Sequence, residues 1–535
     1  MKRAALAAAL LCSLGPAAGA AAALPDDRGW EMVSPIEKNG GEVELQGPDP
    51  GDPLSRAAAD GDSVTYSSPA SFGDSPQGAP PLSQYVATRS ASGWLTQNVS
   101  PPHLSGAYEG NPHLAFSGDL GHAVYLNPGR CPGEEPCPPG VQLQELPGGA
   151  LTPSPAEPGQ FEGASANLEH LVFAQGADLY RWSPPAAALV KVNAAPAEAL
   201  AARRGAVSDD GARVYWQGAD GNLYLGEGGE TTQVDAAVGG EGEFVAASGD
   251  GRFAFFSKEG HLHRFDAVAA GSTDLTPGGE VLTVLGASAD GAAVFYLLGD
   301  DLRRWREGAG AVQVVTGPGL ADVDPLTSGV SAGGERLFFT TDKALRAVDT
   351  NNDADAYQWE AQGTGSCDKA GGCVELISSG RAEGGARFVA ASANGSDAFF
   401  LTDRSLAGAD PGSVDLYVAR VGGGFPEPPS PIPCTGDSCQ SLPSEPVDPT
   451  LTTLLSGLGN PKVRFRRALR NCRPAIRAAR RASRRANRAS RRARRAGKGG
   501  PARAKRRRAA RLSKRAKAAR RAAKRCRRAN RGGQG

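Results

Sequence analysis

The sequence predicts an all-β protein, a β-propeller of about eight four-stranded blades with seven as the alternative, followed by a basic α-helical hairpin. Three observations predict this fold: a strand pattern that recurs down the chain, an abundance of glycine, and a C-terminal segment of arginine and alanine. Glycine occurs 71 times, whereas aromatic residues make up 6% of the 535 residues. Because a chain of this length exceeds one compact core, at least two structural units are expected.

The clearest copy of the repeat covers residues 205–234. Ser208 precedes an Asp-Asp-Gly turn, and three apolar segments follow it, separated by further turns. Asp-Gly supplies the positive φ that a tight hairpin requires, and alternating apolar and polar residues are typical of half-buried strands. Similar starts recur, most of them about 40 to 58 residues apart, at positions 57, 114, 164, 246, 287, 330 and 391. A meander repeated at this period must stack on its neighbours, and a radial arrangement leaves only short, protected edges.

The last copy of the repeat lacks a fourth strand. Its three strands, near 388–391, 398–401 and 415–418, run into Gly422 and a proline-rich stretch. Residues 30–34 resemble the fourth strands of other copies, such as 374–378. We therefore predict that the N-terminal strand completes the last blade and closes the ring, which protects the sheet edge. In the third strands we expect a shared leucine to point into the blade: Leu179, Leu223, Leu262, Leu302 and Leu416.

Residues 1–23 have the pattern of a Sec-type secretory signal peptide. Met1, Lys2 and Arg3 precede an apolar run over 4–14, and small residues follow it. We expect an exported protein that is secreted or associated with the cell envelope, with the propeller in residues 24–424.

The cysteine spacing predicts disulfides. Nine cysteines occur, and one of them, Cys12, lies in the signal peptide. Paired cysteines agree with export, whereas zinc is the weaker interpretation because the pairs are not Cys-x-x-Cys and no histidine is near them. The predicted pairs are Cys131 with Cys137, Cys367 with Cys373, Cys434 with Cys439, and Cys472 with Cys526.

The copies that begin at Ser208 and Ser288 share the pattern Ser-x-Asp-Gly-Ala-x-Val followed by two aromatic residues. With the Leu-Tyr type strands that come after them, they resemble the TolB-like, WD40-like propeller repeats of exported bacterial proteins. The resemblance covers about residues 27–424. It implies a propeller that binds partners, and it does not name a reaction.

Residues 349–357 predict a calcium loop. Side chains with oxygen ligands stand at alternate positions, Asp349, Asn351, Asp353 and Asp355, which is how a loop wraps a hard cation. The glycine and the distal glutamate of a complete calcium loop are missing. An Asx-rich turn without metal is therefore the alternative. Calcium is the one cofactor that the sequence indicates.

Two further patterns are explained better by the repeat than by catalysis. Ser331 lies in a nucleophile-elbow pattern, but no histidine follows His263 in the chain, and Ser331 aligns with the turn serines of other copies. His261 and His263 could share a metal with Asp266, yet they occupy ordinary repeat positions. We therefore expect a binding protein and not an enzyme, with an extracellular propeller-based hydrolase or lyase as the alternative.

The C-terminal part is a proline- and serine-rich linker, 425–461, and a basic segment, 462–535. The basic segment contains 33 of the 59 Lys and Arg and no Asp or Glu, so the rest holds 26 basic against 57 acidic residues, a net charge of −31. Small residues in a 3-4 spacing on both sides of the glycine-rich stretch 497–501 predict two helices. Since residue 499 lies 27 residues from both Cys472 and Cys526, an antiparallel hairpin would bring these cysteines together.

This density of positive charge predicts binding to a polyanion, with an affinity that falls as salt rises. Export favours anionic envelope polymers or lipid head groups. Docking on the protein's own acidic body and binding of nucleic acid are the alternatives. We expect the propeller to be a monomer that binds an unknown protein or glycan. The arginines predicted to contact the anion are Arg480, Arg481, Arg484, Arg485, Arg491, Arg492, Arg506, Arg507, Arg508, Arg520 and Arg521.

Overall fold

The structure is a computed structural model of the chain. It describes residues 24–44, 54–72, 82–100, 112–127, 140–155, 159–184, 186, 188–194, 205–279, 281–315, 320, 323–406, 410, 413–425, 510, 511, 513, 514 and 517. The chain divides into two compact units, residues 1–430 and 431–535. In the second unit, the described residues Ala510, Arg511, Ser513, Lys514 and Lys517 are helical. None of the helices within the described ranges is both long and apolar enough to cross a membrane.

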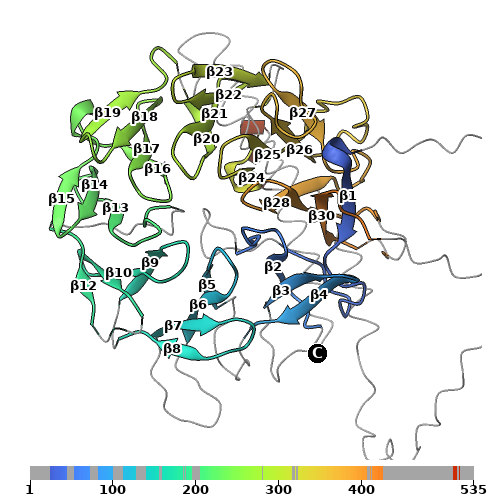
Figure 1. Ribbon diagram of the computed structural model, residues 1–535, viewed down its shortest axis with the longest axis horizontal. Coiled ribbons are helices and arrows are strands. Elements are labelled where there is room, and N and C mark those ends of the chain that lie inside the picture. Colours follow the sequence, from blue (N-terminus) through green and yellow to red (C-terminus); the bar gives the residue numbers. More distant parts are fainter. Residues whose placement is uncertain are drawn as a thin grey trace, which may run out of the picture. The chain divides into compact units, whose positions relative to one another are not determined.

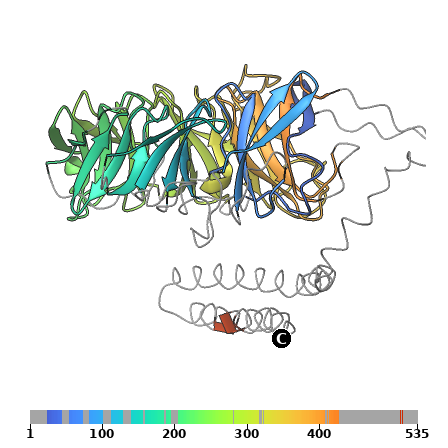
Figure 2. The ribbon, with the colours of Figure 1, turned by 90° about the horizontal axis from the view of Figure 1, so that it is seen from below.

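The described strands of the first unit form eight antiparallel sheets that stand side by side in a ring (Figure 1). This arrangement confirms the predicted propeller and its eight blades. The first strand of each blade lies nearest the axis of the ring, and later strands lie progressively farther out. Seen from the side, the strands of neighbouring blades run across the thickness of the ring (Figure 2).

We number the blades in chain order. Blade 1 contains β2 (Ser63–Ser68), β3 (Ser83–Ser90) and β4 (Gly93–Asn98), and blade 2 contains β5 (His113–Phe116), β6 (His122–Asn127), β7 (Gly140–Glu145) and β8 (Leu151–Pro153). Blade 3 contains β9 (Gln160–Ala164), β10 (Leu171–Gln175), β11 (Asp178–Trp182) and β12 (Val190–Lys191). Blade 4 contains β13 (Arg213–Gln217), β14 (Leu223–Glu227) and β15 (Glu230–Gln233). In blades 1 and 4 isolated β-bridges take the place of a first strand. They join Ala57 to Val64 and Glu44 to Ser67 in blade 1, and Val207 to Val214 in blade 4.

Blades 5 to 8 have four strands each. Blade 5 contains β16 (Glu243–Ala247), β17 (Phe253–Lys258), β18 (His261–Asp266) and β19 (Gly271–Asp274), and blade 6 contains β20 (Val281–Ala287), β21 (Ala293–Leu298), β22 (Asp301–Arg306) and β23 (Gly310–Val315). Blade 7 contains β24 (Ser328–Val330), β25 (Arg336–Thr341), β26 (Asp355–Glu360) and β27 (Cys373–Leu376). Blade 8 contains β28 (Ala386–Ala391), β29 (Asp397–Thr402), β30 (Asp415–Val421) and β1 (Arg28–Met32). Three short 3-10 helices in the described ranges are η1 (Pro25–Asp27), η2 (Ala236–Val238) and η4 (Pro325–Thr327).

The N-terminal strand closes the ring, as predicted. β1 pairs antiparallel with β30, from Arg28 opposite Val421 to Met32 opposite Tyr417. Strands from opposite ends of the propeller sequence therefore share blade 8. The pairing covers an edge of β30 that would otherwise be open to other chains.

The hydrophobic core lies between the blades. Each of the eight described core clusters spans one interface between neighbouring blades. In β25, Leu337 and Phe339 pack toward blade 6, whereas Phe338 packs toward blade 8. Alternate residues of one strand thus stabilise two different interfaces.

This packing corrects one expectation. The half-buried alternation predicted for the strands is absent from the second strands, whose central residues are buried on both faces, as in β13, β21 and β29. Both faces are covered because every blade is sandwiched between two others. The leucines expected to point into the blades are all fully buried: Leu179, Leu223, Leu262, Leu302 and Leu416.

Candidate functional site

The turn between the first and second strands uses the same serine contact in most blades. In blade 4, Ser208 Oγ donates to Asp210 at 2.7 Å and accepts the backbone N–H of Arg213 at 2.9 Å. Gly211 completes the turn with a φ of 64°, which costs a residue without Cβ little. Ser331 accepts the N–H of Arg336 at 2.9 Å in the same way. The alignment of Ser331 with the turn serines is therefore confirmed, and its hydroxyl serves the turn.

These turns also join neighbouring blades through the backbone. In seven of the eight blades, the residue after the turn serine, or after Ala58 in blade 1, donates its N–H to the equivalent carbonyl of the next blade at 2.6–3.0 Å. The bonds run from Ala59 to Gly118, Gly118 to Ala166, Asp209 to Gly249, Gly249 to Ala289, Ala289 to Ala332, Ala332 to Ala393 and Ala393 to Ala59. The backbone at these positions therefore lines the inner rim of the ring.

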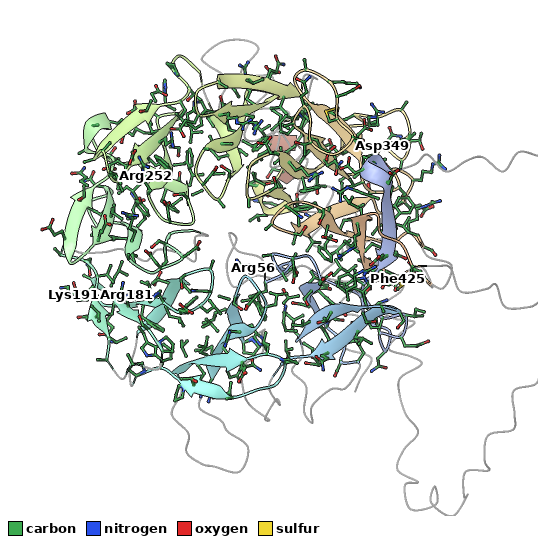
Figure 3. The ribbon with its side chains drawn as sticks, in the orientation of Figure 1. Arg56, Arg181, Lys191, Arg252, Asp349 and Phe425 are labelled. Carbon is green, nitrogen blue, oxygen red and sulfur yellow. A yellow bond between two sulfur atoms is a disulfide. The ribbon has the colours of Figure 1, made fainter. Side chains whose placement is uncertain are left out.

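Asp209 departs from the pattern at this rim, because the equivalent residues of the other blades are alanine or glycine. Burial raises its pKa above the usual range, the Asp210 and Asp250 carboxylates act in the same direction, and Arg56 opposes them. Figure 3 shows Arg56 at the inner side of the ring, where it donates to the carbonyl of Phe116 at 2.8 Å. The rim therefore presents small side chains together with a carboxylate and a guanidinium.

The predicted calcium loop lies between β25 and β26, with Asp349 labelled in Figure 3. Asp349 is 6% exposed. Its Oδ2 accepts the Tyr357 hydroxyl at 2.5 Å, and its Oδ1 has no hydrogen-bond partner among the described residues. Asn351 Nδ2 donates to Asp355 Oδ2 at 2.7 Å. Asp353 is half-buried and donates its backbone N–H to Asn351 at 2.9 Å. The structure thus gathers Asp349, Asn351 and Asp355, and Asp353 joins them through its backbone.

Asp355 is fully buried and accepts the Ser378 hydroxyl at 2.6 Å. Burial raises the pKa of Asp355 to about 6, with a further contribution from the negative charge of Asp349, against the hydrogen bonds from Ser378 and Asn351. Within the described ranges, no group of three or more His, Cys, Asp or Glu side chains is arranged to hold a metal. This loop has two carboxylates and one amide.

The two histidines of β18 have separate partners. His261 Nδ1 lies 2.9 Å from Asp274, and His263 stacks on Phe256 with ring centroids 5.1 Å apart. Asp266, the third ligand considered above, forms an ion pair with Arg252 at 2.9 Å. These contacts support the interpretation that the histidines are variations of the repeat.

The Cys367–Cys373 disulfide is present, with Cα atoms 5.6 Å apart. Several other predictions lie outside the described residues: the signal peptide, the linker after Phe425, and the tail arginines predicted to contact the anion. The remaining predicted disulfide cysteines lie outside them as well, namely Cys131, Cys137, Cys434, Cys439, Cys472 and Cys526.

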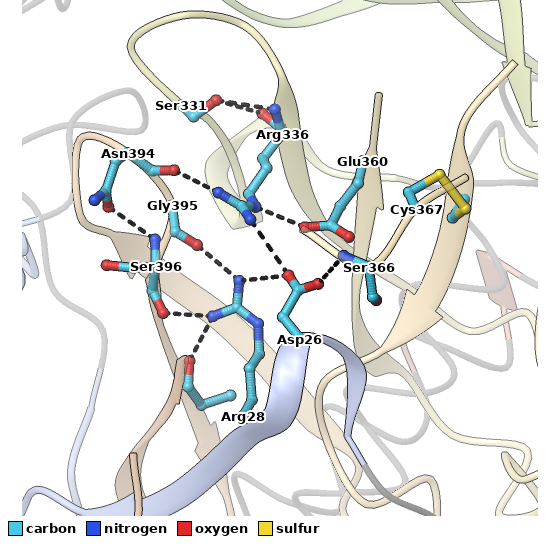
Figure 4. Close-up of polar contacts among 12 residues, drawn as sticks. Asp26, Arg28, Ser331, Arg336, Glu360, Ser366, Cys367, Asn394, Gly395 and Ser396 are labelled. Carbon is cyan, nitrogen blue, oxygen red and sulfur yellow. Dashed lines mark hydrogen bonds and ion pairs between the residues drawn. A yellow bond between two sulfur atoms is a disulfide. The ribbon is translucent and has the colours of Figure 1, made fainter. Parts of the chain in front are cut away.

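Sequence reasoning missed a buried cluster of charged residues at the start of β1 (Figure 4). Arg28 is 5% exposed, and its guanidinium donates to three backbone carbonyls of blade 8 at 2.6–2.8 Å. These carbonyls belong to Gly395, Ser396 and Ala419. One arginine thus attaches the N-terminal strand to two segments of blade 8.

Asp26 extends this cluster into blade 7. Its carboxylate lies 3.8 Å from Arg28 and 3.3 Å from Arg336, and it accepts the backbone N–H of Ser366 at 2.6 Å. Arg336 also pairs with the buried Glu360 at 2.7 Å. We refer to Asp26, Arg28, Arg336 and Glu360 as the closure cluster. The cluster joins two segments that are far apart in the chain, since Asp26 and Arg336 are 310 positions apart. The sequence signal of its members is their charge alone.

The closure cluster contains two carboxyl groups with opposite pKa changes. Burial, followed by the Asp26 carboxylate, raises the pKa of Glu360 to about 7 against the effect of Arg336. Burial also acts to raise the pKa of Asp26, but hydrogen bonds from Glu360 and Ser366 and the charge of Arg28 lower it to about 2. At neutral pH, Asp26 is thus ionised while Glu360 is partly protonated.

No protein-family model matches this chain, and no curated protein matches it either. Among solved structures, dipeptidyl peptidase 4 of Porphyromonas gingivalis is similar, with 10% identity and a TM-score of 0.42 over 63% of this chain and 56% of that chain. A candidate TolB of Agrobacterium tumefaciens has 16% identity and a TM-score of 0.27 over 53% of this chain and 94% of that chain. This chain spans little more than half the length of the peptidase. The propeller itself is established by the strand pairing, and membership of the TolB-like family stays a prediction.

Proposed function

We propose that this protein is an exported propeller that acts as a binding scaffold, held on anionic cell-envelope material by its arginine- and alanine-rich C-terminal segment. The observation that carries the proposal is the separation of charge along the chain. Residues 1–461 have a net charge of −31, whereas residues 462–535 have 33 positive and no negative side chains. Such a segment attracts polyanions, and export selects envelope polymers or lipid head groups as the partners it meets.

The architecture of the propeller supports a scaffold role. The ring is closed by a backbone pairing and by the closure cluster, so it offers a fixed surface to a protein or glycan. At the inner rim, the side chains other than Asp209 are small, and Asp209 and Arg56 provide charge. Ser331 and the histidines of β18, which could serve a hydrolase, have structural partners.

The test compares where the protein is found in the cells that produce it. We expect the full-length chain to sediment with the envelope and to be released by about 1 M salt, at which the Debye length falls to about 3 Å. A chain ending at Asp448 should be free in the medium. A full-length variant in which the eleven tail arginines named above become glutamine keeps 22 of the 33 positive side chains and should be released at a lower salt concentration than wild type.

A matched control replaces the same eleven arginines by lysine, which keeps the charge, and should behave as wild type. Release by nuclease instead of salt would identify nucleic acid as the partner. If the unchanged full-length chain is free in the medium, the anchor is wrong, and docking of the tail on the acidic body becomes the better account.

A further inference from the structure

The loop between β26 and β27 of blade 7 covers the carboxylate of Asp26. Asp26 Oδ1 accepts the backbone N–H of Ser366 at 2.6 Å. The loop backbone also passes close by at Gly365, where a Cβ would lie 2.2 Å from Asp26 Oδ1. The Asp26 side chain is 2% exposed. Figure 4 shows Ser366 beside this carboxylate, directly before Cys367 and its disulfide.

The turn that carries Asp26 has an uncommon backbone conformation. Asp26 and Asp27 both have positive φ, at 57° and 49°. Residues other than glycine rarely adopt this left-handed region, and they persist there only where their surroundings hold them. The contacts of the Asp26 carboxylate thus stabilise the turn that leads into β1.

The Cys367–Cys373 disulfide anchors the loop that covers Asp26. Among residues 362–371, Cys367 alone is buried, with 3% of its surface exposed. Its partner Cys373 is the first residue of β27. Because Ser366 directly precedes Cys367, the disulfide ties the donor of Asp26 to the sheet of blade 7.

The hydrogen bonds of the loop also meet at Cys367. Its N–H donates to the carbonyl of Thr364 at 3.0 Å, and its carbonyl accepts the N–H of Gly363 at 2.8 Å. These bonds form the turn that presents the Ser366 N–H. A crosslink restricts the conformations open to the segment that it closes. The position of the Ser366 N–H therefore depends on the disulfide.

We propose that the Cys367–Cys373 disulfide is a redox-sensitive device that controls how firmly β1 closes the ring. With the bond formed, the loop holds Ser366 on Asp26, and β1 stays paired with β30. With the bond reduced, the loop loosens, Asp26 loses this donor, and the pairing of β1 with β30 opens more often. The proposal is independent of the function of the tail.

The redox step is an exchange between thiols and disulfides. A small dithiol gives two electrons and two protons to the protein disulfide. The S–S bond of the protein breaks to leave two thiols, and the dithiol becomes a cyclic disulfide. A disulfide oxidant takes the same electrons and protons back when the bond re-forms. Because the cytosol keeps thiols reduced, the ring closes firmly only after the chain has left a reducing compartment.

The experiment measures hydrogen exchange of the full-length protein by mass spectrometry, with dithiothreitol as the dithiol. Oxidised wild type is compared with wild type whose cysteines at 367 and 373 are shown by alkylation to be reduced. We expect the amides of β1 and β30 to exchange at least about tenfold faster after reduction, as for loss of a hydrogen bond to a charged group. Exchange in β18 of blade 5 should be unchanged.

Three variants assign the effect to this disulfide. The double variant Cys367→Ser with Cys373→Ser should show the fast exchange of β1 without dithiothreitol, and no further change with it. In Asp26→Ala, exchange of β1 should already be fast, and reduction should add little, because the contact through which the disulfide acts is gone. The matched control is Lys369→Ser, an exposed position between the two cysteines, which should behave as wild type.

Equal exchange of β1 in oxidised and reduced wild type overturns the proposal. Acceleration by dithiothreitol in the double variant also overturns it, because another disulfide would then be responsible. Equal acceleration of β1 and β18 would mean that reduction loosens the whole propeller, which contradicts a specific role in closure. If the double variant does not fold, reduction of wild type and of Asp26→Ala still decides the question.

Discussion

At the scale of single residues, the turn serines show why so much of this fold is visible in the sequence. Ser248 donates to Asp250 at 2.6 Å and accepts the N–H of Phe253 at 3.0 Å, so these hydrogen bonds lie within five residues. Local hydrogen bonds of this kind depend on sequence spacing alone. The Ser-x-Asp-Gly pattern therefore predicts the turns that begin at Ser208, Ser248 and Ser288.

Other residues act through partners far away in the chain. Asp26 meets Arg336 across 310 positions, and Arg28 meets Gly395 across 367. A charged side chain near the N-terminus gives no sign of which distant group it will contact. The closure cluster was for this reason not predicted.

Glu360 should make the stability of the propeller pH-dependent. Its pKa in the folded state is raised to about 7 from 4.5. The folded state therefore binds more protons than the unfolded state between these values, and the contribution of Glu360 to stability falls as pH rises from about 4.5 to 7. The slope from this one group is at most about 1.4 kcal/mol per pH unit. Asp26, with its lowered pKa, loses its contribution only below about pH 4.

The measurement is the urea midpoint between pH 4.5 and 8 for wild type and Glu360→Gln. Glutamine can still hydrogen-bond to Asp26 and Arg336 but does not titrate, so the variant should show a smaller fall in stability across this window. Glu307→Gln, in an exposed ion pair with Arg264, is the control and should follow wild type. An identical slope in wild type and Glu360→Gln would show that Glu360 does not titrate there.

At the scale of elements, each of three fourth strands is followed by a serine or threonine whose hydroxyl bonds to the third strand. This shared contact explains why the N-terminal segment resembles the fourth strands of other blades. Ser34 accepts the N–H of Leu416 at 3.0 Å, and Ser378 accepts the N–H of Ala356 at 3.1 Å. Thr276 accepts the N–H of Leu262 at 2.9 Å. The segments 30–34, 374–378 and 273–276 look alike because they bind a third strand in the same way.

Loss of Arg28 should loosen β1. Arg28→Ala removes the donor to three buried carbonyls and leaves Asp26 with fewer positive partners. Breaking one side of a buried charged network typically costs about 3–5 kcal/mol. We expect faster hydrogen exchange of the β30 backbone amides than in wild type, together with self-association through the uncovered edge.

The control for β1 is Arg252→Ala, which removes a partly exposed ion pair with Asp266 in blade 5. Such pairs contribute about 0–1 kcal/mol, so exchange in β30 should be unchanged. Equal exchange in Arg28→Ala and wild type would mean that the backbone pairing of β1 is sufficient to close the ring.

At the scale of the whole molecule, stability and charge are organised differently. The core is divided among the interfaces between blades, so each blade depends on two neighbours and on ring closure. Charge is divided along the chain, with the acidic residues before position 462 and a purely basic segment after it. This division is a property of composition and concerns binding, not the propeller fold.

The basic segment should bind a soluble polyanion with strong salt dependence. For the full-length protein and polyphosphate we expect the affinity to fall by on the order of 10³-fold or more between 50 and 200 mM salt, as for six or more neutralised phosphates. Fluorescence titration at several salt concentrations measures the slope. The variant with eleven arginines changed to glutamine keeps 22 of the 33 positive side chains and should have a shallower slope. An affinity of the wild type that is insensitive to salt would contradict the electrostatic interpretation.

The sequence by itself determined the repeat, the number of blades to within one, the origin of the closing strand, and the Cys367–Cys373 disulfide. Each of these follows from contacts that are local or that recur in copies. Tertiary structure decided the rest: the burial of the second strands on both faces, the closure cluster, and the buried Lys38–Asp415 pair of blade 8. Those features depend on which residues the ring places side by side. Lys38 and Asp415, 377 positions apart, meet only because the two ends of the propeller share one blade.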